Sequence, residues 1–465
     1  MNRRSSKRKG LVLVVVTVVI LLVSLAAFGF LSQMQAEHKA ARARGDMLQA
    51  AAMAASGREY LAAVLEAPRA QRPVGGGYSD QPEAFGDLLV DGEEEDEDDA
   101  RQGKCCVITA TTSLDASRPF RFGFQNESSK LHLQSLVDWD RRRQGAGRTA
   151  LMNLPGMDES TADAILDWID SDEEPREYGA ESDYYSGMNP SYRPRNGCPP
   201  AMEELLLVRG VTREKLFGYD VNANYRVDDW EQQAATDVVD STSSGEVTIP
   251  WVHLLTIYSG ERNETYEGQP RINLNDNELG ELHQKLSTVF ELGWANFIVA
   301  YRQFGPYRGN KEGEEAASHT IDLTVSAKQR IRSPLELIGT RVEIPIDDES
   351  SIVLDSPFTS DESAMREYLP RFMDGVTIRT STRILGRVNV NLAAREVIAG
   401  IPGVDSDLVE RIMGARSMTE TEDPARRHAV WLLTEGVVDV MQMRRLLPYV
   451  TTGGDVGRAQ ILGYY

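Results

Sequence analysis

The chain has 465 residues, of which 41% are hydrophobic and 26% are charged, and its formal net charge is −21. This length predicts two or three folded units rather than one. A body this acidic repels nucleic acid and anionic lipid headgroups, so the composition argues against a nucleic-acid-binding protein and favours divalent cations or basic partner surfaces.

A basic leader, residues 1–10, precedes a strongly apolar stretch. Residues 11–31 contain no charged side chain. At about 1.5 Å per residue, a helix of this length crosses the roughly 30 Å hydrocarbon core of a bilayer. Because the cations lie before the apolar stretch, the positive-inside rule keeps the leader in the cytoplasm and sends the rest of the chain across the membrane. Helical spacing continues to Pro68, so we expect one transmembrane and spine helix over residues 11–66.

A plain membrane anchor and a cleaved signal peptide are alternatives for this stretch. A signal peptide has its small-residue cleavage site after the apolar run, whereas Gly10 lies before it. The order Lys9, Gly10, Leu11 resembles the processing site of type IV prepilins and type II secretion pseudopilins. In that family a dedicated prepilin peptidase cuts after the glycine and methylates the new N-terminal residue, which here is Leu11.

The fifth residue after this cleavage site departs from the usual pilin pattern. Most members of the family carry a glutamate there, whereas this chain has Val15. A buried carboxylate without a counter-charge is costly. The absence therefore resembles the K class of minor pseudopilins, which lies at the tip of the filament with no subunit above it.

The segments after the spine helix alternate between polar loops and short strands. Residues 67–104 combine glycines with an acidic run and predict a solvated loop. Residues 105–133 predict a pilin-like β-hairpin, because Phe120, Phe122 and Phe124 alternate with polar or small residues. Residues 451–465 predict a returning C-terminal strand. Cys105, Cys106 and Cys198 leave two alternatives open, free thiols or one disulfide to Cys198.

Two stretches of the chain repeat a Pro-Gly turn followed by an amphipathic helix. Leu154–Asp158 and Ile401–Asp405 each end in an aspartate that can cap the following helix. These are helix-hairpin-helix-like (SAM-like) units. We place the first in an inserted helical domain with acidic loops, residues 134–387, and the second in residues 388–450.

A second recurrent pattern is apolar-Asn-apolar-Asn, at Ile272–Asn275 and Val388–Asn391. In an extended segment both amides lie on one face, and the second can cap the next helix. Asn275 and Glu278 have the spacing of a capping box. We interpret these asparagines as structural.

The first repeat continues into a longer run that identifies a family. Asp167, Trp168, Ile169 and Asp170 are followed by Gly179, Ala180, Glu181, Tyr184 and Tyr185, and this run is similar to the general secretion pathway protein K family of type II secretion. The resemblance implies an α+β fold in which a long N-terminal transmembrane helix and a small antiparallel sheet carry a large inserted α-helical domain.

The same resemblance implies a function. Such a minor pseudopilin lies at the tip of the pseudopilus, initiates its assembly with the I and J class minor pseudopilins, and supports export of secreted protein substrates across the outer membrane. It would be a single-pass protein of the inner membrane with the bulk of the chain in the periplasm.

Two acidic segments are candidate calcium sites. In the first, four carboxylates follow the end of a helix: Asp170, Asp172, Glu181 and Asp183. Calcium prefers hard oxygen ligands such as these. The resemblance implies calcium binding in this helical domain.

The second segment has the spacing of an EF-hand loop, at Asp220, Asn222, Asn224, Arg226, Asp228 and Glu231, where position 7 gives its backbone carbonyl. The usual glycine at position 6 is Tyr225, so an Asx-rich turn is the alternative reading.

No catalytic motif stands out. The sequence lacks a glycine-rich phosphate loop, a nucleophile elbow and a His-Glu-x-x-His zinc motif, so we do not expect an enzyme. The alternative function is a membrane-anchored periplasmic DNA receptor, because helix-hairpin-helix units bind phosphate through backbone amides at the turn. Asp158 and Asp405 follow these turns and would repel phosphate, so we expect no nucleic-acid partner.

Overall fold

The computed structural model describes residues 9–73, 78, 80–91, 103–110, 120–218, 231, 249–346, 350–416 and 423–464. The chain divides into two compact units. The first comprises Met1–Leu61, Glu83–Val107 and Ile461–Tyr465, and the second comprises Ala62–Pro82 and Ile108–Gln460. The second unit is thus inserted, in sequence, between segments of the first.

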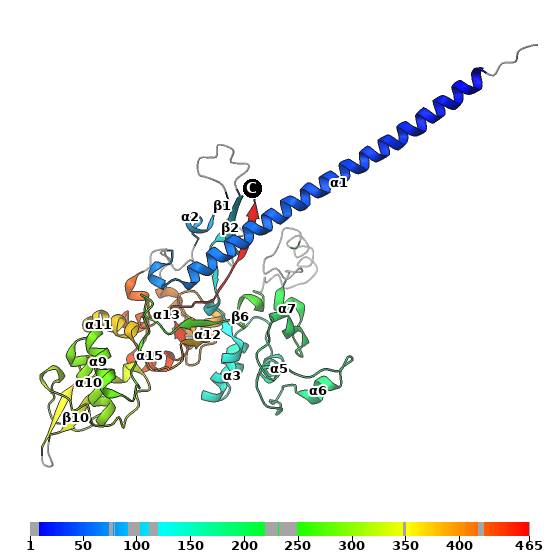
Figure 1. Cartoon of the computed structure of the whole chain (residues 1–465). Helices are drawn as coiled ribbons and strands as arrows, with labels where there is room; N and C mark the ends of the chain where they lie inside the picture. Colours follow the sequence, from blue (N-terminus) through cyan, green and yellow to red (C-terminus); the bar gives the residue numbers. More distant parts are fainter. Residues whose placement is uncertain are drawn as a thin grey trace, which may run out of the picture. The chain divides into compact units, whose positions relative to one another are not determined.

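Helix α1 (Lys9–Glu66) is a single unbroken helix of 58 residues (Figure 1). Its apolar residues near the N-terminus are exposed, Leu11 to 72% and Phe28 to 71%. An 18-residue window within it has a mean hydropathy of 3.2 and none of it is buried. Length and composition therefore fit a single-pass membrane anchor, as the sequence predicts.

In the first unit, a small sheet packs against the C-terminal half of α1. Its strands run in the order β1 (Leu88–Asp91), β2 (Gly103–Ala110) and β17 (Gln460–Tyr464), and β1 pairs with β2 in the antiparallel sense. Gly57 of α1 makes the close approach possible, because a Cβ there would lie 2.7 Å from Ile461 Cγ2 and 2.9 Å from Cys105 Sγ.

The segment predicted as one solvated loop, residues 67–104, is partly ordered, so that prediction is wrong for its described part. It contains the 3₁₀ helix η1 (Arg69–Gln71), the short helix α2 (Pro82–Phe85) and β1. Phe85 is fully buried and its ring meets Tyr60 edge-on. The apolar side chains of this segment therefore order it despite its overall polarity. The acidic run 93–99 lies outside the described residues.

The predicted hairpin pairing is present. Strand β3 (Phe120–Phe122) runs antiparallel to the end of β2, with Ile108 opposite Phe122, and Phe124 is fully buried. The connecting residues 111–119 are not among those described. All three cysteines are free thiols, and burial raises the pKa of each.

The second unit contains many short helices around one large apolar core. Its α-helices are α3 (Leu133–Arg142), α4 (Ala146–Met152), α5 (Glu159–Ile169), α6 (Ser182–Ser186), α7 (Arg213–Phe217), α9 (Leu279–Val289), α10 (Leu292–Phe304), α11 (Glu362–Gly375), α12 (Arg395–Ala399), α13 (Ser406–Ala415), α14 (Trp431–Thr434) and α15 (Val440–Leu446). In the described part of this unit, the further 3₁₀ helices are η4 (Glu127–Ser129), η5 (Met202–Leu207), η6 (Trp251–His253), η7 (Ala316–Ser318), η8 (Pro334–Leu337) and η9 (Pro424–Arg426).

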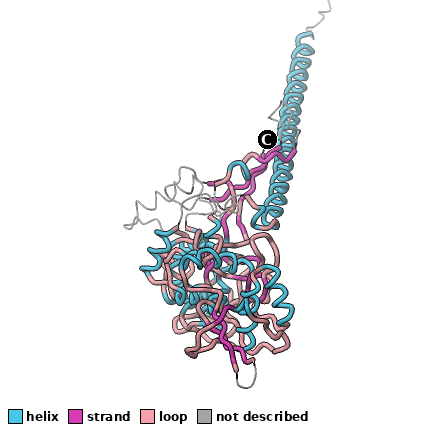
Figure 2. Tube along the Cα trace, turned by 90° about the vertical axis from the view of Figure 1, so that its left-hand side faces the viewer, coloured by secondary structure: helices cyan, strands magenta, loops and turns pink. Residues whose placement is uncertain are grey.

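This unit also contains short strands, several of them within residues 134–387, which the sequence predicts as a helical domain. Figure 2 shows them as short segments (magenta) among helices and loops. Strands β9 (Glu314–Glu315), β10 (Arg341–Pro345) and β11 (Ser351–Asp355) form a three-stranded sheet. The other strands form two-stranded pairs: β4 (Gln125–Asn126) with β16 (Gly457–Arg458), β5 (Leu131–His132) with β6 (Leu255–Thr256), β7 (Gly260–Arg262) with β13 (Arg383–Leu385), β8 (Ile272–Asn273) with β12 (Val376–Thr377), and β14 (Val388–Asn389) with β15 (Val450–Thr451).

The apolar-Asn-apolar-Asn segments are two of these strands, but the predicted capping box is wrong. The Glu278 N-cap of α9 makes no side-chain cap hydrogen bond. Asn275 instead accepts from the backbone N–H of Ile331 (2.9 Å) and donates to its carbonyl (2.8 Å). The first asparagine, Asn273, makes a local turn by accepting from the N–H of Asn275. The second amide thus joins a distant segment rather than capping the next helix.

Candidate functional site

The two Pro-Gly turns have the same local structure. Asp158 Oδ1 accepts the N–H of Thr161 (2.9 Å) at the start of α5, and Asp405 Oδ1 accepts the N–H of Leu408 (2.8 Å) at the start of α13. Gly156 and Gly403 adopt positive φ angles of 65° and 91°. The capping predicted for both repeats is therefore confirmed.

These caps bear on phosphate binding. Burial opposes ionisation of Asp158, but its hydrogen bonds to Thr161 and Lys215 prevail and lower its pKa to about 2. The helix N-termini that would receive a phosphate thus already hold a carboxylate.

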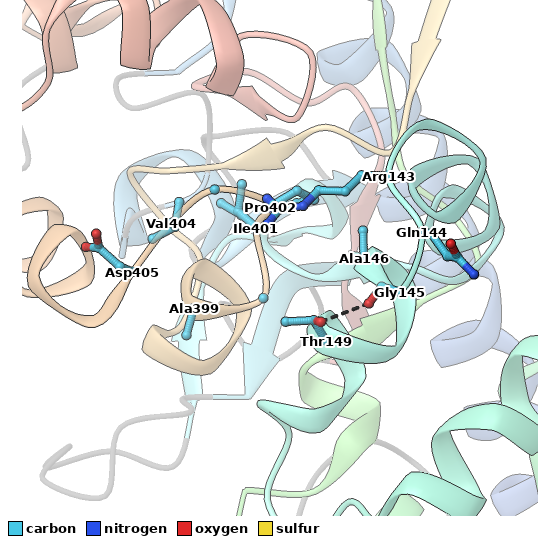
Figure 3. A pocket seen from close by; sticks show the side chains of 12 residues that line it. Arg143, Gln144, Gly145, Ala146, Thr149, Ala399, Ile401, Pro402, Val404 and Asp405 are labelled. Carbon is cyan, nitrogen blue, oxygen red and sulfur yellow. Dashed lines mark hydrogen bonds between the residues drawn. The ribbon is translucent and has the colours of Figure 1, made fainter. Parts of the chain in front are cut away.

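The second turn lines a pocket of about 370 Å³ in the second unit. Figure 3 shows Ile401, Pro402, Val404 and Asp405 on one side and Ala146 and Thr149 of α4 on the other. Arg143 and Asp405 are the charged residues of its lining. These two charges compensate, so the pocket offers no excess of positive charge to a nucleic-acid backbone.

A cluster of buried acidic residues on and after α5 is the strongest candidate site. Asp163 and Asp167 are one helical turn apart and fully buried, and Asp170, at the end of the helix, is 5% exposed. Arg148 of α4 pairs with Asp163. Arg176 pairs with Asp170 and lies 2.7 Å from Asp167 Oδ1. Two arginines therefore compensate three carboxylates.

The Gly179-Ala180-Glu181 turn completes this cluster. A side chain on Gly179 would collide with the carboxylate of Asp167. Trp168 lies on the other side of the same run, where its indole N–H donates to Glu204 (3.1 Å) and its ring meets Tyr185 edge-on at 5.2 Å. The residues from Asp167 to Tyr185 are thus one packed structural unit.

Glu181 is the uncompensated member of the cluster. Its side chain is buried, and both carboxylate oxygens, like Asp170 Oδ1, have no hydrogen-bond partner in the described part of the chain. Burial, followed by the charges of Asp167 and Asp170, raises the pKa of Glu181 to about 8. A proton or a cation must therefore neutralise this carboxylate at neutral pH.

The predicted calcium ligands do not all converge. Asp172 and Asp183 are exposed, and Asp172 accepts the N–H of Glu174 instead. Among the described residues, no three metal-ligating side chains are arranged around one point. The unpartnered oxygens of Asp170 and Glu181 are of the kind that bind a hard cation.

The EF-hand-like segment cannot be placed, because Asp220, Asn222, Asn224, Arg226 and Asp228 lie outside the described residues. Glu231 is described and is buried.

Sequence reasoning missed four residues of the cluster: Asp163, Asp167 in its buried role, Arg148 and Arg176. The i, i+4 spacing of the two aspartates within an otherwise apolar helix was the available signal.

Comparison with known proteins identifies one domain. Residues 129–217 match the family model of type II secretion system (T2SS) protein K. No curated protein sequence matches the chain. A solved chain of the GspK–GspI–GspJ complex from the type 2 secretion system of enterotoxigenic Escherichia coli is similar at 16% identity with a TM-score of 0.26. The match covers 37% of this chain and 55% of that one, so this chain spans about half the length of the solved chain.

Proposed function

We propose that this chain, whose residues 129–217 form a domain of type II secretion system protein K, is a minor pseudopilin. The observation that carries the proposal is α1, an unbroken helix of 58 residues whose apolar part is exposed, in the same chain as that domain. In this role α1 anchors the protein in the inner membrane and packs among neighbouring pseudopilins, and the bulk of the chain lies in the periplasm. The task is mechanical, and no reaction is assigned.

The proposed place is the tip of the pseudopilus. We assign the I and J class minor pseudopilins as partners, because the resemblance of the sequence to the K class implies them. Together they would initiate assembly and contact the secreted protein. The prepilin peptidase is the proposed processing partner.

Processing supplies the direct test. We expect mass spectrometry of protein from cells with prepilin peptidase to find a methylated N-terminus at Leu11, and from cells without it to find the leader still attached. A Gly10→Ala control keeps the helix but should reduce cleavage. An uncut leader in both strains, or a cut beyond residue 31, would overturn the proposal.

The proposed place at the tip of the pseudopilus predicts how a carboxylate at position 15 would affect pseudopilus assembly. Val15→Glu should leave membrane insertion intact but reduce the number of pseudopili, because a buried carboxylate without a counter-charge is costly. Electron microscopy of pseudopili in cells that overproduce the major pseudopilin measures this. The matched Val15→Leu variant should assemble normally, and normal assembly of the glutamate variant would remove this argument for the tip.

We further propose that calcium binds at Asp170 and Glu181. The ion would supply the positive charge that the two unpartnered carboxylates lack and would stabilise the folded domain by binding only to it. The proposal rests on the unpartnered oxygens of these residues. The loop 220–231 is the second proposed calcium site, on ligand spacing alone.

Glu181→Gln tests the first site. Because the pKa of Glu181 is raised to about 8, the stability associated with its protonated form is complete below pH 4.5 and is lost as the pH rises toward 8. In EDTA at pH 8 the variant should therefore be more stable than the parent by about 1–3 kcal/mol. Calcium should raise the melting temperature of the parent more than that of the variant. An equal calcium response in both would remove Glu181 from the site, and Glu177→Gln, a change at an exposed neighbour, is the control.

A further inference from the structure

A second pocket in the second unit, of about 590 Å³, is lined by eight arginines. Its walls come from segments far apart in sequence, among them η1, the last turn of α3, β7, β13, β15 and α15. Glu261 is the one carboxylate that lines it in the described part of the chain. Such a concentration of cations is unexpected in a chain whose net charge is −21.

Five of these arginines have no carboxylate within ion-pair distance among the described residues. They are Arg142, Arg271, Arg332, Arg379 and Arg427. Arg271 donates to the backbone carbonyl of Asp374 (3.0 Å), and Arg427 lies 3.8 Å from the ring centre of Tyr266. Both of these direct partners are neutral groups, so neither forms an ion pair with its arginine.

The other three arginines are paired with carboxylates. Arg69 lies 3.1 Å from Asp455, Arg387 pairs with Glu261, and Arg444 lies 3.3 Å from Glu336.

A fourth carboxylate, Asp374, lies 3.5 Å from His428, whose pKa is lowered by burial so that it is neutral at pH 7. The eight guanidinium groups that line the pocket therefore outnumber the four carboxylates that contact its lining residues.

The arginines repel one another in the free protein. Burial, and then the charge of Arg69, lower the pKa of both Arg271 and Arg387 to about 10. Burial and the charge of Arg142 lower the pKa of Arg379. The Nε atoms of Arg387 and Arg427 are buried without a hydrogen-bond partner in the described residues. Arg271 and Arg427 are partly buried, and cations withdrawn from water are normally paired with anions. An anion bound between these arginines would therefore stabilise the folded protein.

We propose that this pocket binds a small multivalent phosphate. The planar guanidinium fork matches phosphate oxygens in a bidentate arrangement, and phosphate supplies several negative charges in a small volume. The volume lies within the usual range for small-molecule sites. Met373, Val376 and Ile384 also line the pocket, so the ligand can carry an apolar part. A soluble oligophosphate and the headgroup of an anionic phospholipid share this chemistry. The inference does not depend on the proposed function.

The test uses the full chain in detergent at constant ionic strength, with pyrophosphate as the first probe. Pyrophosphate should raise the melting temperature in a saturable way. The double variant R142Q/R379Q removes two exposed, unpaired arginines at the rim of the pocket. It should fold normally and bind pyrophosphate roughly 10- to 100-fold more weakly by calorimetry. The control R141Q/R383Q removes two arginines that are also exposed but do not line the pocket, and it should bind like the parent.

A short-chain phosphatidic acid below its micelle concentration is the second probe. Tighter binding of this lipid than of pyrophosphate, again weakened in R142Q/R379Q alone, would identify a lipid headgroup as the ligand. Tighter binding of pyrophosphate would identify a soluble phosphate. Both outcomes support the site. Binding of neither probe at millimolar concentration, or equal weakening in the two double variants, would overturn it.

Discussion

Replacing Asp455 by alanine is expected to lower the free energy of unfolding by about 3–5 kcal/mol, because the change leaves buried cations without their counter-charge. The Asp455 side chain is only 8% exposed, with Oδ1 2.8 Å from Arg72 and Oδ2 3.1 Å from Arg69. Oδ2 also accepts the backbone N–H of Arg262 (2.7 Å). One carboxylate thus joins three segments of the second unit.

Arg72 and Arg262 also donate hydrogen bonds to the C-terminal end of α1. Arg72 donates to the carbonyl oxygens of Leu65 (2.8 Å) and Ala67 (3.1 Å), and Arg262 donates to those of Leu65, Glu66 and Ala67. The last carbonyls of a helix have no partner within the helix, and cations stabilise this end of its dipole. Without Asp455 the Arg72 guanidinium loses the carboxylate that orients it, and Arg262 loses the acceptor of its backbone N–H. We therefore also expect faster hydrogen exchange in the last turn of α1.

The pH dependence separates the role of charge from that of packing. Burial opposes ionisation of Asp455, but Arg69 and Arg72 prevail and lower its pKa to about 2, from 3.8. Its ionised form therefore stabilises the fold above about pH 4, and about 2 kcal/mol of this contribution is lost as the pH falls toward 2. The difference in melting temperature between the parent and Asp455→Ala should narrow over that range. Asp407→Ala, a change at an exposed aspartate, should have little effect, and a pH-independent difference would contradict the charge argument.

Features set by neighbouring residues could be predicted from the sequence. The uncharged stretch predicts α1, and the Pro-Gly turns with their aspartate caps predict the starts of α5 and α13, because each depends on contacts within a few residues. The pairing of β2 with β3 follows for the same reason, since alternation is a local pattern.

Features that join distant segments could not be predicted. Asn275 has the spacing of a capping residue, yet its partner is Ile331, 56 residues further on. The arginine-lined pocket draws its walls from residues between Arg69 and Thr452. Nothing in the local sequence around any of these arginines distinguishes it from a solvated surface cation, because only the fold brings them together.

The acidic cluster lies between these two cases. The sequence singled out Asp170 and Glu181, and the structure leaves oxygens of both unpartnered. The sequence also included Asp172 and Asp183, which are exposed, and overlooked Asp163 and Asp167, which lie within the helix. Proximity along the chain does not show which carboxylates are buried, because helical periodicity, not sequence order, decides this.

Replacing Arg176 by alanine should destabilise the second unit by about 3–5 kcal/mol at pH 7 in EDTA. Arg176 contacts Asp167 and Asp170, which are both buried, and lies 3.5 Å from Asp140. Removing this cation leaves buried carboxylates beside Glu181, which is itself uncompensated. Thermal unfolding of the full chain in detergent measures the loss. Arg176→Lys keeps the charge without the planar fork and should lose less.

The sign of the pH effect follows from the carboxylates. Burial raises the pKa of Asp167 and of Asp170 despite the opposing pull of Arg176. Their protonated forms need no counter-charge, so the deficit of the Arg176→Ala variant should shrink as the pH falls through these raised values and grow again as it rises. Arg193→Ala, a change at an exposed arginine in the following loop, should show no such trend. A deficit that stays constant with pH would mean that Arg176 acts through the packing of its aliphatic stem.

The response of the Arg176→Ala variant to calcium also tests the proposed ion site. If Asp170 and Glu181 hold a divalent cation, calcium supplies the positive charge that Arg176 no longer provides, and it should restore more stability to Arg176→Ala than it adds to the parent. The double variant Arg176→Ala/Glu181→Gln should lose most of this rescue. Equal calcium responses in the parent and in Arg176→Ala would mean that the arginine alone neutralises the cluster and that calcium, where it binds, does so elsewhere.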